Sequence, residues 1–559
     1  MVERFLKVIN KEVRGIHQAA YLLGAFAIVS QLLALLRDRL FASAFGAGET
    51  LDMYYAAFRL PDLLFAGVTS LLSVYVLIPF FAEKIGEGRQ RARAFLNSML
   101  TGYLVLMGVA SLLVFIFAPF VLPKIFSGAL GHSSELVLLC RILLIQPILL
   151  GLSSLLGTVT QFNRKFFLYS LSPILYNVGI ILGVVFLYPQ MGNAGLVWGV
   201  VLGAFLHLAI QIPYTLSTGF FPYPTVRFSF SEFWKAAVLS LPRTIALSAN
   251  QIALLVITSL ASGIATGSIA IFNLALNLQA VPLAIIGVSY SVAAFPTLAR
   301  LFSEGNREAF FAQITAASRH IVFWSFPTLA LFIVLRAQIV RTILGAGAFD
   351  WDDTRLTAAA VALFIVSLLA QSLVLLLVRG YYAAGKTATP LIVNVTSALL
   401  SIVFCFGLLH IFETSSSFAH FIESLLRVSG IPGTAILMLP LGYCLAQIIN
   451  ASLLLILFER DLNRFAHELL PGVVQSFGAS VFMGFVAYLL LNILDNVFDI
   501  QTLAGIFSQG LFAGLGGIVA GIALLRLLKN RELAEIISST RSRIFSTPAV
   551  APNEVEPKV

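Results

Sequence analysis

Residues 34–62 read ALLRDRLFASAFGAGETLDMYYAAFRLPD, and they join two long apolar stretches of the chain. The segment carries charged side chains that an ordinary membrane helix excludes: Arg37, Asp38, Arg39, Asp52, Arg59 and Asp62. A charge at membrane depth is costly and usually faces a cavity or a partner, so this segment is a candidate functional site. The two glycines of its FGAG turn suit a loop between two helices.

The composition of the chain is typical of a membrane protein. Of its 559 residues, 59% are hydrophobic and only 11% are charged, and many stretches that are long enough to cross a bilayer carry no charge. This pattern predicts an all-α polytopic membrane protein and argues against a soluble enzyme. The net charge of +9 does not require a nucleic-acid partner, because Lys and Arg in cytoplasmic loops produce the same sum.

Hydropathy predicts about 14 transmembrane helices of roughly 20 residues or more. They are expected at 17–44, 52–81, 95–122, 135–160, 167–188, 194–216, 232–261, 267–299, 312–344, 357–383, 388–412, 433–458, 469–494 and 503–528. Loops rich in Lys and Arg, such as 82–94 and 300–319, alternate with loops poor in them, such as 189–193 and 495–499. Positively charged loops stay in the cytoplasm, so the pattern places both termini there.

An internal repeat divides these spans into two groups. The sequence PILYN at 173–177 recurs as PLIVN at 390–394, and Pro79 recurs at the same offset as Pro296. Six spans separate the copies, which indicates two parallel six-helix lobes plus two C-terminal helices. The expected segments are a cytoplasmic amphipathic N-terminus (1–16), an N-lobe (17–216), a cytoplasmic linker (217–231), a C-lobe (232–458), two further spans (469–528) and a partly disordered cytoplasmic tail (529–559).

The sequence contains no motif of enzyme chemistry. There is no P-loop, no GxSxG and no HExxH, and the seven histidines are scattered. Cys140, Cys405 and Cys444 lie far apart in apolar stretches, so they are expected to be buried thiols. We therefore expect no catalytic residue, no metal site and no cofactor.

The charged residues inside the predicted spans each have two explanations. Arg37 and Asp38 either hold an anionic substrate in a cavity or form a pair that reaches the outer interface. For Arg59, beside Pro61, a charge cluster at a helix start is the stronger interpretation. Arg243, in the seventh span, either faces the cavity or reaches the cytoplasmic surface.

The combined pattern favours a cationic cavity between the two lobes. Arg offers paired donors to phosphate, so a phosphate-bearing substrate suits such a cavity. The eighth span also carries Asn273 and Asn277, and for these residues hydrogen bonds between helices are the favoured interpretation.

Several of these stretches resemble one known family. The run RDRLFASAFGAGETLDMYYAAFRLPD (37–62) resembles the hallmark of the MurJ (MviN) lipid II flippases of the MOP exporter superfamily. Further similar stretches are TQFNRKFFLYSLSPILYN (160–177), VPLAIIGVSYSVAAFPTLARLFSEGN (281–306), GAGAFDWDDT (345–354) and VRGYYAAGKTATP (378–390). The likeness runs from about residue 20 to residue 530.

The resemblance implies a transporter of the bacterial cytoplasmic membrane. Its substrate would be lipid II, a peptidoglycan precursor linked to undecaprenyl diphosphate, moved from the inner to the outer leaflet by alternating access. The spans in 469–528 would line a groove for the polyprenyl tail. Membrane lipids and cell-wall synthesis proteins would be its partners. Arg37, Asp38 and Asp52 match family positions that are important for function.

The chain departs from the family pattern at three cavity positions. Gln31, Phe65 and Asn277 stand where the family commonly has arginine, and Arg59 and Arg243 are the arginines that could compensate. The predicted substrate-binding residues are therefore Arg37, Asp38, Asp52, Arg59 and Arg243. Two alternatives stay open, which are export of another polyprenyl-linked glycan and a scaffold for cell-wall assembly that transports nothing.

Overall fold

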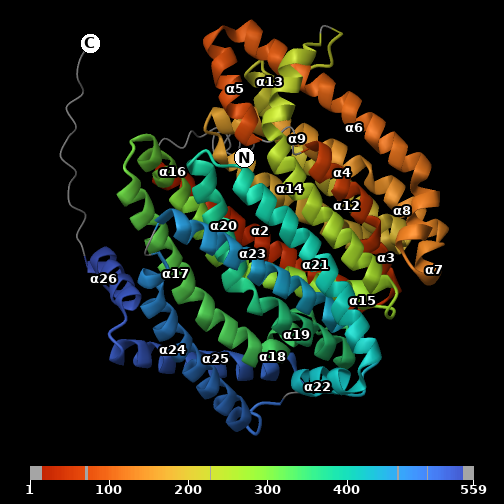
Figure 1. Ribbon diagram of the computed structural model, residues 1–559. Helices are drawn as coiled ribbons and strands as arrows, with labels where there is room; N and C mark the ends of the chain where they lie inside the picture. Colours follow the sequence, from red (N-terminus) through yellow and green to blue (C-terminus); the bar gives the residue numbers. More distant parts are fainter. Residues whose placement is uncertain (1–15, 70–73, 227, 463–464, 500–501, 546–559) are drawn as a thin grey trace.

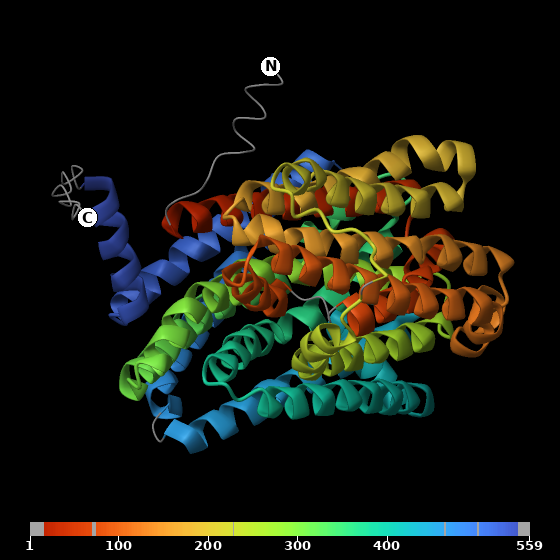
Figure 2. The same cartoon turned by 90° about the horizontal axis from the view of Figure 1, so that it is seen from above.

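The computed structural model describes residues 16–69, 74–226, 228–462, 465–499 and 502–545. In these ranges every regular element is a helix, and most helices run in a roughly common direction (Figures 1 and 2). A helix satisfies its backbone polar groups internally, which a bilayer requires. The outer faces carry large apolar side chains such as Val105 and Val519, which are 62% and 67% exposed. Such surfaces are suited to contact with lipid.

The helices follow one another with short connections. The first part of the chain forms α2 (Ile16–Phe45), α3 (Glu49–Ala57), α4 (Arg59–Val68), α5 (Val74–Gly86), α6 (Arg89–Ile125), α7 (Gly128–Gly131), α8 (Ser134–Leu143), α9 (Ile145–Phe162), α10 (Phe166–Leu182), the π-helix η2 (Gly183–Leu187), α11 (Tyr188–Met191), α12 (Asn193–Ala209) and α13 (Ile212–Ser217). The second part forms α14 (Phe230–Ser262), α15 (Ser268–Leu283), the π-helix η3 (Ala284–Val288), α16 (Ser289–Ser303), α17 (Arg307–Val334), α18 (Arg336–Leu344), α19 (Trp351–Val366), α20 (Leu368–Ala383), α21 (Ala388–Thr414), α22 (Ser416–Leu426), the 3₁₀ turn η4 (Thr434–Leu437), α23 (Met438–Leu462), α24 (Phe465–Leu494), α25 (Leu503–Leu527) and α26 (Arg531–Phe545).

Twelve predicted spans match apolar helices of the structure. Eleven helical stretches of the described residues are long and apolar enough to cross a membrane, and α19 with α20, bent by 43°, makes a twelfth. They correspond to the predicted spans from 95–122 to 503–528. The helix α2 has 30 residues, about 45 Å at 1.5 Å per residue, which is also sufficient length. The full count of fourteen stays a prediction.

The predicted second span, 52–81, is not one continuous helix. α3 ends at Ala57, and α4 begins at Arg59. Pro61 explains the break, because a proline ring clashes with the carbonyl four residues earlier and has no N–H to donate. Residues 70–73, between α4 and α5, lie outside the described residues. The break therefore falls at Phe58, in the middle of the stretch that carries the candidate charges.

The helix α15 lies at the centre of the packing. Most of its residues from Ser268 to Gln279 are buried, and it packs against α3 on one side and α19 on the other. Aromatic pairs extend this core, with ring centroids 4.8 Å apart for Phe41 and Tyr54 and 5.2 Å apart for Phe272 and Phe364. Because α3 and α15 are more than 200 residues apart in sequence, this core joins the first part of the chain to the second.

The other helices surround this centre. α2 packs along α10, α4 packs on α14, and α10 packs closely on α12. In the last pair, a side chain on Gly179 or Gly183 would collide with the backbone of Gly203 or Gly199, so only glycine allows the helices to approach so closely. α24 and α25 pair with each other and attach to α17, at the edge of the molecule in Figure 1.

Candidate functional site

The candidate site begins where α3 meets the start of α15. Both carboxylate oxygens of Asp52 accept hydrogen bonds from α15, from Gly267 N at 2.6 Å and from Ala270 N at 2.8 Å. The first N–H groups of a helix have no partner within the helix, and a negative charge there is favourable. Asp52 therefore caps α15 from a distant part of the chain, and its own side chain is only 5% exposed.

Gly267 has to be glycine for two reasons. Its φ of +88° lies in the left-handed region, and a Cβ at this position would lie 1.9 Å from the carbonyl oxygen of Ala47. We expect Gly267→Ala to lower the free energy of unfolding by about 1–3 kcal/mol, from backbone strain and overpacking. The measurement is the melting temperature in detergent.

The matched control for this prediction is Gly263→Ala in the same turn. Gly263 has a φ of −89°, and a Cβ there would meet nothing closer than 3.5 Å. Equal melting temperatures for the two variants would contradict a tight contact between the turns of Ala47 and Gly267.

A second contact joins α4 to α15. Nη2 of Arg59 donates to Oδ1 of Asn273 at 2.5 Å, and the Asn273 side chain is fixed by a bond from its Nδ2 to the Ile269 carbonyl at 2.7 Å. Arg59 is 7% exposed. Its Nε is buried and has no hydrogen-bond partner among the described residues. A buried N–H without an acceptor costs free energy. A ligand that places an acceptor oxygen here would recover that cost.

A third contact joins α2 to α15 and α10. Arg37 donates from Nε and Nη2 to Oδ1 of Asp38, at 2.9 and 2.8 Å, and from Nη1 to Oδ1 of Asn177 at 3.2 Å. The other oxygen of Asp38 accepts from Nδ2 of Asn277 at 3.1 Å. Asp38 is 3% exposed and has both oxygens satisfied. Three of the five N–H groups of Arg37 take part in these bonds, so the guanidinium keeps donor capacity.

Tyr55 is within electrostatic range of both arginines. Its hydroxyl interacts electrostatically with Arg37, Asp38 and Arg59, yet it is buried and has no hydrogen-bond partner among the described residues. The group of Arg37, Asp38, Tyr55 and Arg59 is called the arginine cluster below. Its two cations act on two carboxylates, because Asp62 interacts electrostatically with Arg59. The N–H and O–H donors that the protein does not fill suit a ligand rich in acceptor oxygens, such as a phosphate.

The contacts with α15 follow its helical period. Gly267, Ala270, Asn273 and Asn277 are three or four residues apart, so they lie along one face of the helix or at its first turn. This face carries the contacts of Asp52, Arg59 and Asp38 in that order. One helix therefore determines the relative positions of α2, α3 and α4.

A further set of contacts lies beside the FGAG turn. Arg39 Nη1 donates to the carbonyls of Thr342 and Ile343 at 2.6 and 3.1 Å. Ala348 N donates to the Ser43 carbonyl at 2.9 Å, and Ala47 N donates to Oδ2 of Asp353 at 2.9 Å. Together with the bonds of Asp52 to Gly267 and Ala270, these contacts are called the latch. The latch attaches the turn after α2 to the second part of the chain.

Four of the five predicted site residues lie around α15, and the fifth does not. Arg37, Asp38, Asp52 and Arg59 contact this helix or a neighbour of it. Arg243 lies on α14, where its charge acts on the Tyr382 hydroxyl of α20. Its substrate-binding role, like that of the other four, stays a prediction.

Sequence reasoning missed two members of the site. Asn177 is visible in the sequence only as the last residue of the PILYN repeat, and its counterpart Asn394 also contacts another helix, through Nδ2 of Asn450 at 3.1 Å. Tyr55 is one of fifteen tyrosines and has no distinguishing spacing. The hydrogen bonds between helices predicted for Asn273 and Asn277 are confirmed.

The fold defines a multi-pass membrane protein. A solved structure of lipid II flippase MurJ in an inward closed conformation matches with a TM-score of 0.71 and 20% identity, and covers 91% of this chain and 100% of that one. An inward-facing multidrug resistance MATE transporter of the MOP superfamily matches with a TM-score of 0.63 and 15% identity, over 80% and 99% of the chains. At these identities the likeness concerns the fold alone.

Sequence comparison identifies the family. The model of the lipid II flippase MurJ family matches residues 41–508, so the chain belongs to this family. The lipid II flippase MurJ of Burkholderia cenocepacia is 25% identical over 386 residues, which cover 67% of this chain and 75% of that protein. The family match begins just after Arg37 and Asp38.

Proposed function

We propose that this chain is a lipid II flippase, which moves the peptidoglycan precursor linked to undecaprenyl diphosphate from the inner to the outer leaflet. The observation that carries the proposal is the arginine cluster, in a chain of the MurJ family. The buried guanidinium of Arg59 and the partly exposed one of Arg37 keep donors that match a diphosphate, which has several charged acceptor oxygens. The protein carries out transport and no covalent chemistry.

The residues of the site take different roles in this proposal. Arg37 and Arg59 contact the diphosphate, with the Tyr55 hydroxyl between them. Asp38 orients Arg37 and balances its charge. Asp52 holds α15 in place, so it acts on the substrate through that helix. Arg243 contacts the substrate at the cytoplasmic entrance.

Alternating access supplies the movement. In the proposal an N-lobe (17–216) and a C-lobe (232–458) move relative to each other, joined by the linker 217–231, and α15 with the latch lies where they meet. The helices in 469–528 provide a surface for the polyprenyl tail. Large exposed apolar side chains support this role, among them Val474 and Phe485 on α24 and Phe512 on α25.

The proposed orientation puts both termini in the cytoplasm of a bacterium and the chain in its inner membrane. The Lys- and Arg-rich loops support this orientation. The latch then lies on the outer side, since the FGAG turn and the loop 345–356 are both outer loops. Its closure in the structure corresponds to a transporter that is shut toward the outside.

Complementation tests the proposed function. We expect the wild-type chain to restore growth to a bacterium depleted of its own lipid II flippase, because the chain supplies the missing transport. A second measurement distinguishes transport from scaffolding. It follows the transfer of labelled precursor to the outer leaflet, where an external lipid II-binding reagent can reach it. Growth without transport would favour a scaffold. Failure of both, with the protein correctly inserted in the membrane, would favour a different polyprenyl-linked glycan.

A further inference from the structure

Two arginines meet on the side of the molecule that the proposed orientation makes the outer one. Arg336 begins α18, and Arg427 is the C-terminal cap of α22. α22 follows α21, which is long and apolar enough to cross the membrane from the cytoplasmic turn before it. The charge of Arg427 acts on the guanidinium of Arg336, so the two cations are close in space. They are called the outer arginine pair below.

The carboxylates near the outer arginine pair are engaged elsewhere. Among the described residues, neither Arg336 nor Arg427 forms an ion pair. Glu423, one turn earlier in α22, accepts a hydrogen bond from the Thr434 hydroxyl at 2.7 Å. Asp495, at the end of α24, accepts one from Nε2 of Gln509 at 3.3 Å. Two like charges close together raise the free energy, and a bound anion would lower it.

Both guanidiniums keep donors for a ligand. Arg336 donates from Nη1 to the Ile333 carbonyl at 3.0 Å, and the side chain of Arg427 interacts with the Tyr488 hydroxyl of α24. A guanidinium has five N–H groups, so most of them remain available in each case. Arg336 is partly exposed and Arg427 is exposed, so a ligand can reach both from outside.

The backbone of Arg427 is unusual for a residue with a side chain. Its φ of +60° lies in the left-handed region, which glycine commonly occupies at the end of a helix. Its carbonyl accepts a hydrogen bond from Nη2 of Arg355 on α19 at 2.7 Å, which helps to hold this conformation. Arg427 therefore keeps its guanidinium at a position where glycine would be less strained.

An apolar stripe on α24 leads to the outer arginine pair. Exposed side chains three or four residues apart lie along one face of this helix, and they are Val474, Phe477, Val481, Phe485 and Tyr488. The stripe is about 21 Å long at 1.5 Å per residue. It belongs to the surface proposed above for the polyprenyl tail. A chain that follows it outward reaches Tyr488, where the Arg427 guanidinium lies.

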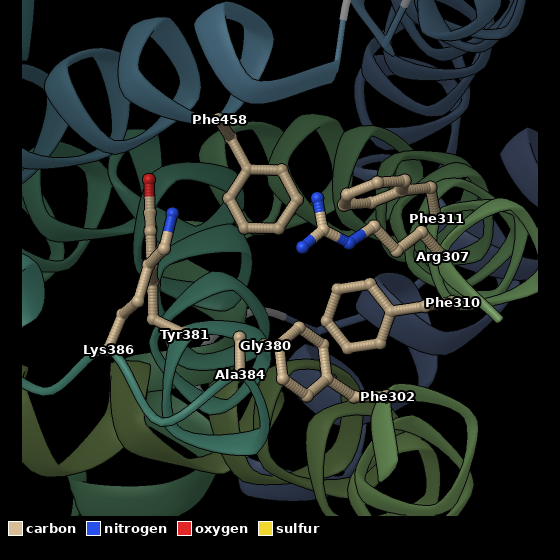
Figure 3. A pocket seen from close by; sticks show the side chains of 9 residues that line it. All are labelled: Phe302, Arg307, Phe310, Phe311, Gly380, Tyr381, Ala384, Lys386 and Phe458. Carbon is tan, nitrogen blue, oxygen red and sulfur yellow. The ribbon is translucent and has the colours of Figure 1, made fainter. Parts of the chain in front are cut away.

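A second group of cations differs from the outer arginine pair. Arg307 and Lys386 line a cavity of about 170 Å³ between α16, α17, α20 and α23, on the proposed cytoplasmic side. Figure 3 shows the Lys386 ammonium near the Tyr381 hydroxyl, across the cavity from Arg307. Lys386 already interacts with another group of the protein, so its charge is partly satisfied.

We propose that the outer arginine pair binds the diphosphate of the transported lipid once this lipid has reached the outer leaflet. The inference rests on the proposed function and adds a release site to it, separate from the arginine cluster. A diphosphate that joins a polyprenyl chain to a sugar carries two negative charges, which match the two cations, whereas a phosphatidylglycerol carries one. The tail lies on the stripe of α24, and the sugar faces the outer water.

Photo-crosslinking of the purified full-length protein tests the proposal. The probe is a sugar-linked polyprenyl diphosphate with a diazirine on the isoprene unit next to the diphosphate, and mass spectrometry identifies the labelled peptides. Below saturation, we expect Arg336→Gln/Arg427→Gly to lower labelling of α24 around Tyr488 about 25-fold, since each cation near an anionic lipid contributes about a factor of five. Labelling of the peptides that carry the arginine cluster should stay unchanged.

Matched variants separate this site from general charge and from folding. Glycine adopts the backbone of Arg427 without strain, so Arg427→Gly should not lower the melting temperature. If Arg336→Gln is unstable, Arg427→Gly alone carries the test with a loss of about fivefold. Arg141→Gln removes another cation on the proposed outer side, from α8, and should change labelling less than about twofold.

Four outcomes would contradict the proposal. Unchanged labelling of α24 in the double variant, with the arginine cluster labelled, would exclude the release site and leave the proposed function standing. A probe that labels neither region would count against the proposed function itself. Phosphatidylglycerol that suppresses the labelling as well as unlabelled probe does would indicate a site for any anionic phospholipid. Inorganic diphosphate with the same effect would indicate a site for free phosphates.

Discussion

We expect Arg37→Ala to abolish the growth of a bacterium that depends on this chain as its lipid II flippase. The substitution removes a guanidinium that donates two hydrogen bonds to Asp38 and one to Asn177. Asp38 is buried and Arg37 is partly exposed, so the substitution leaves a buried carboxylate without its cation, at a cost below the roughly 3–5 kcal/mol of a fully buried pair. It also removes the donors that the proposed function assigns to the diphosphate.

Further variants separate a binding role of Arg37 from a structural one. Arg37→Ala/Asp38→Ala removes both charges, so no unpaired carboxylate stays buried. If this double variant is stable but still fails to support growth, Arg37 is needed for the substrate. If it restores growth, the pair serves structure alone. Arg91→Ala, which replaces an exposed arginine in the first turn of α6, is the matched control and should grow like the wild type.

The second large effect is expected at Asp52, where Asp52→Ala should open the latch. Loss of this cap leaves two N–H groups at the start of α15 without an acceptor, which costs about 1–2 kcal/mol. Leu51→Cys serves as the reporter, since Leu51 is fully buried next to Asp52. A thiol reagent that does not cross membranes should label this cysteine about tenfold faster when Asp52 is replaced.

Glu49→Ala is the matched control for the latch experiment. Glu49 lies in the same helix and carries the same charge, but its side chain is exposed. Its replacement should leave the labelling rate of Leu51→Cys unchanged. The native thiols Cys140, Cys405 and Cys444 are buried, and the protein without the reporter cysteine measures their background. Slow labelling in both variants would mean that Asp52 does not hold the latch closed.

The sequence predicts where the helices of this protein lie along the chain better than it predicts which helices contact one another. Hydropathy locates twelve spans, because a helix in lipid has to be apolar along its whole length. It merges α3 and α4 into one span, because averaging over about 20 residues hides a break near one proline, Pro61. The three cysteines expected to be buried are buried.

The candidate site shows the same limit. Arg37, Asp38 and Arg59 stand out in the sequence because charges are rare in apolar stretches. Their partners could not be predicted, since the bonds of Arg59 to Asn273 and of Asp52 to Gly267 cross more than 200 residues of chain. Periodicity within one helix carries no information on which distant helix faces it.

The single face of α15 constrains how this chain can change over evolutionary time. Inserting one residue between Gly267 and Asn273 would rotate the rest of the helix by about 100°, because each residue turns an α-helix by that angle. The partners of Asp38 and Arg59 would then leave their positions together, although no contacting residue had been replaced. Alignments of close relatives should therefore contain no gaps in this stretch, while exchanges at 38 with 277 and at 59 with 273 should occur as pairs.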